Sequence, residues 1–125
     1  LGNQKSIGEI FQITSDEVLS WDQIHLELYQ ALGQTPNVIH IPSDLIARFD
    51  EGAIGSLIGD KSNSVVFDNS KIKRFVPDFN CKVKWSEGLR SSLAWFEAHP
   101  EYQTIDNESN QLWDKIIAGY TKAFS

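Results

Sequence analysis

The sequence predicts a small α/β domain of short strands with about five helices, and three observations lead to that fold class. A strand pattern, a helix pattern and a second strand pattern follow one another between residues 9 and 41 with short connections. This order is typical of a βαβ unit with parallel strands. Helical periodicity then dominates the rest of the chain. A length of 125 residues with 41% hydrophobic residues suits a single domain, residues 1–125, with one modest core.

Three short segments carry the strand patterns. Residues 9–13, Glu-Ile-Phe-Gln-Ile, alternate between polar and apolar side chains, as a half-buried strand does. Residues 37–41, "NVIHI", and 64–67, "SVVF", are rich in β-branched and aromatic side chains. We therefore expect three strands, the first two in parallel pairing.

The first helix is expected to begin directly after the first strand. Thr14 is followed three residues later by Glu17, which is the spacing of a capping box. An apolar face then continues to Leu32, and Gly33 supplies a C-terminal stop.

Later helices are predicted from their start and stop residues. A glycine-punctuated loop or broken helix separates the first of them from the third strand. Asp68 is a plausible N-cap for the segment "NSKIKRF". Three helices are expected at Pro42 and Ser43 through Phe49, at the segment that Pro77 stops, and from Ser86 to a stop at Pro100. A last helix starts at Asp106 or Asn107, and its inward residues are Trp113, Ile116, Ile117, Tyr120 and Phe124.

Composition excludes several classes of protein. The net charge of −6 disfavours non-specific nucleic-acid binding, which depends on neutralising phosphates. No apolar run approaches the ~20 residues that a membrane span needs. The single cysteine, Cys81, forms no internal disulfide and fits a reducing, cytoplasmic compartment. Lysines and an arginine cluster between residues 71 and 84, and this basic patch either faces an anionic ligand or is a solvated surface.

No catalytic or metal-binding constellation is legible in the chain. His25, His40 and His99 are spread without the spacing of metal ligands. No tyrosine has a lysine four residues after it, so the chain holds no Tyr-x-x-x-Lys pair. The run Gly52-x-x-Gly55-x-x-x-Gly59 follows a helical segment and has the wrong spacing for a dinucleotide fingerprint. We therefore expect no catalytic, cofactor-binding or metal-binding residues here.

One polar cluster is the best candidate for binding a substrate. Its members lie in a glycine-flanked loop or close behind it, and an ordinary turn, a helix cap and a surface lysine are the alternative readings. Loops on a rigid scaffold carry function more often than helices do, and a lysine with short polar side chains suits phosphate and ribose oxygens. The candidate substrate-binding residues are Asp60, Lys61, Asn63, Ser64, Asp68 and Lys71.

Taken together, the segments resemble a known family. The ordered runs are "IGEIFQITSDEVLSWDQIHLELYQALG", "VIHIPSDLIARFD", "GDKSNSVVFDNSKIKRFVPDF" and "WSEGLRSSLAWFEAHPEY", which cover about residues 7–102. They look like the C-terminal substrate-binding portion of the NAD-dependent epimerase/dehydratase family, the extended short-chain dehydrogenase/reductases. "LGN" at residues 1–3 resembles the end of the helix that precedes this region.

The resemblance implies a longer parent enzyme. That enzyme would have an N-terminal Rossmann domain with a glycine-rich loop that binds NAD or NADP and a Tyr-x-x-x-Lys pair, none of which is in this sequence. The missing methionine and the apolar Leu1 likewise suggest a piece of a longer chain. On this interpretation the fragment is inactive alone, binds no cofactor itself, has the missing Rossmann domain as its partner, and belongs to a parent that is a homodimer.

The same resemblance suggests a substrate class. Family members that act on nucleotide sugars carry an Arg-x-Gly-Asp segment before the third strand, which here reads Leu57-Ile58-Gly59-Asp60. Asp60 matches the aspartate of this segment, and Leu57 stands where the family has the arginine that holds the pyrophosphate. Lys61 could supply a positive charge there, but not the bidentate contact that an arginine makes. Ser64 lies where sugar epimerases often place a tyrosine. The expected substrate is a nucleotide sugar or a related hydroxyl or carbonyl compound.

Three hypotheses follow, and each makes a different structural prediction. A substrate-binding portion should leave a large apolar surface uncovered where its Rossmann domain would pack. A free-standing binding or interaction module without catalysis should be monodisperse and fold cooperatively as a 125-residue domain, with a start codon just upstream. A small self-contained enzyme would need a catalytic constellation that the sequence does not show.

Overall fold

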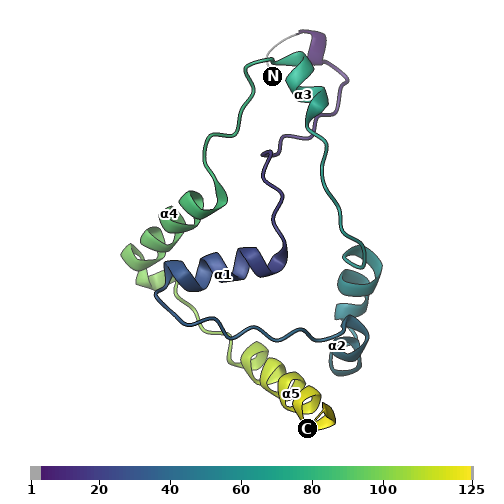
Figure 1. Ribbon diagram of the computed structural model, residues 1–125, viewed down its shortest axis with the longest axis vertical. Helices are drawn as coiled ribbons and strands as arrows, with labels where there is room; N and C mark the ends of the chain where they lie inside the picture. Colours follow the sequence, from purple (N-terminus) through teal and green to yellow (C-terminus); the bar gives the residue numbers. More distant parts are fainter. Residues whose placement is uncertain (1–3, 125) are drawn as a thin grey trace. The chain divides into compact units, whose positions relative to one another are not determined.

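The computed structural model describes residues 4–124, and within them every regular element is a helix (Figure 1). "LGN" at residues 1–3 lies outside the described residues. The α-helices are α1 (Trp21–Ala31), α2 (Ser43–Phe49), α3 (Ser70–Phe75), α4 (Trp85–Ala98) and α5 (Asn107–Phe124). Two 3₁₀ turns, η1 (Gln4–Ser6) and η3 (Pro100–Tyr102), and a π-helix, η2 (Ile54–Asp60), complete the described elements.

The predicted α/β fold class is therefore wrong. Residues 9–13, 37–41 and 64–67 lack regular secondary structure, and no strand occurs in the part of the chain described. The alternation of polar and apolar residues that predicts a strand indicates only that the segment prefers an extended backbone. A strand exists only when a second chain segment accepts and donates its backbone hydrogen bonds, and these three segments do not pair with one another. Without that pairing there is no βαβ unit.

The start of the first helix is also corrected. Helix α1 begins at Trp21, not after Thr14, and its N-cap is Ser20. The Gln23 backbone N–H donates to Ser20 Oγ over 3.2 Å, and the Ser20 N–H donates to Gln23 Oε1 over 2.8 Å. The capping box therefore forms between Ser20 and Gln23. The backbone N–H of each residue donates to the side chain of the other, so two backbone donors are satisfied.

Other predicted helix ends are confirmed. Gly33, with φ +65°, follows the end of α1 in the left-handed conformation that glycine adopts without strain. Helix α2 starts after Pro42 and ends at Phe49. Helix α4 stops two residues before Pro100, and α5 begins at Asn107. These boundaries depend on residues within one turn of the helix end, so the sequence could predict them.

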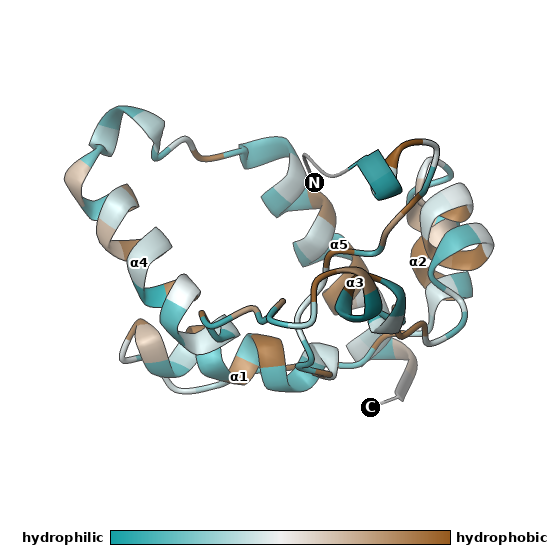
Figure 2. Cartoon of the chain, turned by 90° about the horizontal axis from the view of Figure 1, so that it is seen from above, coloured by the Kyte–Doolittle hydropathy of each residue, from teal (hydrophilic) through white to brown (hydrophobic). Residues whose placement is uncertain are grey.

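The chain forms two compact units, each assembled from two separate stretches of sequence. Unit 1 comprises residues 1–36 and 65–98, and unit 2 comprises residues 37–64 and 99–125. In unit 1, α1 packs beside α4, as Figures 1 and 2 both show. In unit 2, α2 packs against η2 and α5.

The described residues bury little apolar surface. Ile72 of α3 and Ile116 of α5 are the buried side chains among them, one in each unit. In contrast, 25 large hydrophobic side chains are exposed. Figure 2 shows hydrophobic positions, in brown, on the connecting segments as well as on the helices.

Among the described helices, none combines the length and the apolar character that crossing a bilayer requires.

Candidate functional site

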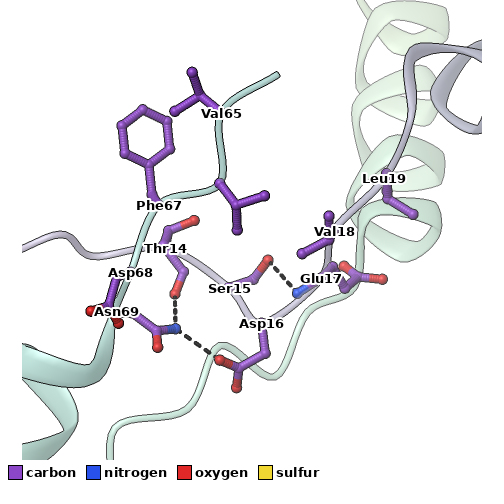
Figure 3. Close-up of a pocket in the computed structure, with 11 residues that line it drawn as sticks. Thr14, Ser15, Asp16, Glu17, Val18, Leu19, Val65, Phe67, Asp68 and Asn69 are labelled. Carbon is purple, nitrogen blue, oxygen red and sulfur yellow. Dashed lines mark hydrogen bonds between the residues drawn. The ribbon is translucent and has the colours of Figure 1, made fainter. Parts of the chain in front are cut away.

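The best-formed pocket lies in unit 1, between two extended segments (Figure 3). Its volume is about 440 Å³, and the segments that line it are Thr14–Leu19 and Val65–Asn69. This volume falls in the range of small-molecule sites, roughly 300–1,000 Å³. The two segments belong to stretches that are remote in sequence, so the pocket exists only because the fold of unit 1 brings them together.

Asn69 holds the two walls of the pocket together. Its side-chain amide donates to the Thr14 carbonyl oxygen over 2.9 Å and to Asp16 Oδ1 over 2.8 Å (Figure 3). Lys73, one turn further along α3, places its Nζ 2.6 Å from the same Asp16 oxygen. The Thr14–Leu19 segment is therefore fastened to α3 by one amide and one ion pair.

Glu17 fastens the same segment to α4. Its Oε2 accepts the backbone N–H of Trp85, the first residue of α4, over 2.8 Å. A carboxylate at a helix N-terminus satisfies an otherwise unpaired donor and interacts favourably with the helix dipole. Because the partners are 68 residues apart, this cap links distant parts of unit 1.

Two carboxyl groups of the pocket have lowered pKa values. The pKa of Asp16 is held below 3.8 chiefly by the hydrogen bond from Lys73 and secondly by that from Asn69. The pKa of Asp68 is lowered first by the Ser70 backbone N–H and then by the Ser70 hydroxyl. Both groups are therefore ionised at neutral pH and act as hydrogen-bond acceptors, not as proton donors.

The pocket combines an apolar wall with hydroxyl and carboxylate groups. Val65, Val66 and Phe67 form an apolar wall, and the Ser15 hydroxyl lies on the opposite segment, where it accepts the Glu17 backbone N–H over 3.3 Å. None of the pocket-lining residues is a histidine, cysteine or lysine.

Four of the predicted substrate-binding residues lie in unit 2. Lys61 Nζ is 4.0 Å from Asp60 Oδ2, and both side chains are largely exposed. Asn63 donates to the neighbouring Ser62 hydroxyl over 3.4 Å, and Ser64 is exposed. These contacts are local and do not create a pocket.

The other two predicted residues lie in unit 1. Asp68 lines the pocket and accepts the Ser70 N–H over 2.8 Å, but the N-cap of α3 is Asn69, one residue after the predicted Asp68. Lys71 makes an ion pair of 2.6 Å with Glu9 and lies 5.2 Å from the centre of the Phe11 ring. Lys71 is therefore engaged with the chain's own residues.

Two of the five cationic side chains of the basic patch pair with carboxylates of the chain itself. Lys71 and Lys73 pair with Glu9 and Asp16, and Arg74 donates to the Ser70 hydroxyl over 3.1 Å. These geometries favour a structural role for the patch over the recognition of an anion.

Sequence reasoning missed Asp16 and Asn69 as members of a site. Asp16 was placed in the first turn of a helix, where a carboxylate is ordinary. Its pairing with Lys73 spans 57 residues, and no spacing rule in a single sequence reports such a contact.

The glycine-rich segment supplies no cradle for a cofactor phosphate. Gly55 and Gly59 lie within η2, and the Gly52 N–H is bound by Asp50 Oδ1 over 3.0 Å. A dinucleotide loop needs a strand directly before it, and here α2 precedes the glycines instead. Among the residues described, no group of three histidine, cysteine or acidic side chains could hold a metal ion.

Comparison with known proteins returns no matching family model, no similar curated protein and no similar solved structure.

Proposed function

We propose that this chain is the substrate-binding portion of an NAD(P)-dependent enzyme of the epimerase/dehydratase type. It acts together with a Rossmann domain that binds NAD or NADP, and it orients a nucleotide sugar or a related hydroxyl or carbonyl substrate. The chain contributes binding and orientation, while the partner domain contributes the cofactor and the catalytic base.

The observation that carries this proposal is the uncovered apolar surface. Ile10 is 83% exposed, Trp21 68% and Val66 67%. Burial of apolar area contributes roughly 25 cal/mol per Å² to folding or association, so an exposed set of this size favours a covering partner. A free-standing module would instead be expected to cover such residues itself.

The unpaired extended segments give a second line of support. Residues 64–67 combine β-branched and aromatic side chains with an exposed backbone, and no strand covers them within the described chain. Such segments are suited to pairing with a sheet that a second domain supplies. The proposal thus accounts for both the sequence pattern and its lack of a partner.

Reading the gene upstream of the Leu1 codon is the first test. The proposal expects roughly 150 to 200 further residues, about one domain, with a strand–glycine-rich–helix start and a Tyr-x-x-x-Lys pair. A start codon within a few residues of Leu1 would remove the enzyme interpretation and favour the free-standing module.

Activity of the longer protein is the second test. NAD(P)H formation or consumption should require both portions, whereas the present chain alone should show neither turnover nor NAD(P) binding in calorimetry. In the longer protein, Asp60→Asn or Lys61→Ala should raise KM, and Ser62→Ala in the same loop is the matched control. Unchanged KM in all three variants would exclude this loop from the substrate site.

A further inference from the structure

Unit 2 contains a pocket of its own, which is lined by residues of α2, η2 and α5. Its volume is about 320 Å³, at the small end of the range for small-molecule sites. Helix α5 lines the pocket with one face, because the residues that it contributes recur at three- and four-residue spacing. These residues are Ser109, Leu112, Trp113 and Ile116.

One wall of this pocket is formed by the π-helix η2. The Lys61 N–H donates to the Ser56 carbonyl oxygen, five residues back, over 2.9 Å. Such turns are rare in proteins and occur frequently at functional sites. Ser56 and Leu57 of η2 both line the pocket, so the irregular backbone lies directly at it. This observation is independent of the volume of the pocket and likewise points to a binding role.

The hydroxyl groups of the lining already donate within the chain. Ser56 Oγ donates to the Ala53 carbonyl oxygen over 3.2 Å, and Ser109 Oγ donates to Asp106 Oδ2 over 2.7 Å. A hydroxyl group has a single hydrogen but two lone pairs. Toward the pocket, each serine therefore offers only an acceptor.

Asp50 is the charged side chain of the lining. Its Oδ1 accepts the Gly52 N–H over 3.0 Å, which fixes the orientation of the carboxylate. Its Oδ2 accepts no hydrogen bond from any residue that the structure describes. No lysine or arginine lines the pocket among the described residues, so the negative charge has no internal counterpart there. A ligand that brings a positive charge and hydrogen-bond donors would complement this lining.

Trp113 provides the second feature that a cationic ligand requires. Its side chain is 47% exposed, so part of the indole ring is open to a ligand. The face of an indole ring attracts an ammonium group more strongly than that of any other side chain. Ile46, Leu57 and Leu112 add apolar surface that suits a hydrocarbon body.

We propose that this pocket binds a small primary amine with an apolar body. The ammonium group donates to Asp50 Oδ2 and to a serine hydroxyl of the lining, and the apolar body packs against Trp113. An ammonium group carries three donors and no acceptor, which matches a lining whose hydroxyls have only acceptors left. The nucleotide sugar proposed above is an anion, so this site takes a different ligand, and failure of one proposal leaves the other standing.

Titration of the whole chain with phenethylamine, followed by NMR chemical shifts, tests the site. The shifts should concentrate at the amides of Asp50 and Ser56 and at the Trp113 indole N–H. Phenethyl alcohol and phenylacetate carry the same ring on a similar short chain and serve as the neutral and the anionic comparison. The alcohol should bind at least about tenfold more weakly, because it lacks the charge-assisted hydrogen bonds, and phenylacetate should cause no shifts.

A matched pair of variants tests the role of Asp50. Asp50→Asn removes the charge but keeps an oxygen for the Gly52 N–H, so unit 2 should stay folded while the affinity for phenethylamine falls about tenfold. Asp44→Asn changes an exposed carboxylate of α2 outside the pocket and should keep the wild-type affinity.

Three results would overturn the amine site. Equal affinities for phenethylamine and phenethyl alcohol would show an ordinary apolar hollow, and shifts with phenylacetate would show a site for anions. An unchanged affinity in Asp50→Asn would exclude the carboxylate as the recognition group. The comparison of the three compounds uses the wild-type chain, so it does not depend on how any variant folds.

Discussion

The two units of the chain are stabilised in different ways. Unit 1 is joined by long-range polar contacts, in which Asp16 meets Lys73 and Glu17 meets the start of α4. Unit 2 is joined by packing of α2 against η2 and against α5, the helix that carries the fully buried Ile116. The comparison teaches that one short chain can use exposed, directional contacts in one part and volume-filling contacts in another. Substitutions and solution conditions should therefore affect the two units differently.

Truncation of Ile116 should have the largest effect, and it should be confined to unit 2. The side chain is 0% exposed, and Ile→Ala at such a site costs about 2–5 kcal/mol through lost transfer energy and a residual cavity. Hydrogen exchange should show loss of protection in α2 and α5, with α1 and α4 unchanged. Ile117→Ala, at a position 38% exposed, should cost clearly less. Equal losses in both units would mean that they unfold as one.

Gly119→Ala tests how closely α5 approaches α2. A Cβ at this position would lie 2.9 Å from Phe49 Cζ, so the ring must move. Since Phe49 is 43% exposed and can swing outward, we expect a cost near the low end of overpacking, about 1 kcal/mol.

Gly88→Ala in α4 is the matched control for that substitution. Its nearest non-helical neighbour would be Val83 Cγ1 at 3.7 Å, an ordinary contact. Alanine should therefore stabilise the helix by about 0.5–1 kcal/mol through its lower backbone entropy. Urea unfolding monitored by circular dichroism should give opposite signs for the two variants, and the same sign for both would contradict the close contact.

Ser20→Ala should destabilise α1 by about 1 kcal/mol, because it removes the acceptor for the Gln23 N–H. Thr14→Ala should leave the helix content of α1 unchanged, although the sequence pattern predicts a cap there. Far-ultraviolet circular dichroism and Gln23 amide exchange measure both effects. A larger loss from Thr14 than from Ser20 would place the helix start where the sequence analysis put it.

Acid should weaken unit 1 through Asp16. The pKa of Asp16 is lower in the folded state than the ordinary 3.8, so its ionised carboxylate stabilises unit 1 fully at a pH above 3.8. This stabilisation is lost as the pH falls through the lowered pKa of the folded state. Since the group is exposed, the effect should be small and reduced by salt. Asp16→Asn should remove this part of the acid dependence of α3 protection, whereas Asp78→Asn should not.

Asp106 allows the same titration to be compared between units. Its pKa is also lowered, chiefly by the Ser109 backbone N–H at 3.0 Å. Its partner is three residues away, so its protonation should fray only the first turn of α5. If acid destabilised the two units to the same extent, the long-range polar contacts of unit 1 would not make its response to pH different from that of unit 2.

Several local features of the fold could be predicted from the sequence. Pro42, Gly33 and Asp68 act on backbone groups within a few residues, so their roles at helix ends follow from residue type and spacing. The candidate pocket could not be predicted, because Asn69 and Asp16 are 53 residues apart and neither belongs to a recognisable motif. The choice of Thr14 with Glu17 as a capping box failed because Glu17 found a better-placed donor at Trp85.

By itself the sequence determined where several helices end and that residues 9–13 and 64–67 prefer an extended backbone. Only the tertiary structure decided that these extended segments remain unpaired and that the carboxylates of Asp16 and Glu17 serve remote partners. The physical reason is range. Caps, prolines and glycines act through bonds and contacts within one turn, whereas strand pairing and long-range ion pairs depend on which distant segment the folded chain brings alongside.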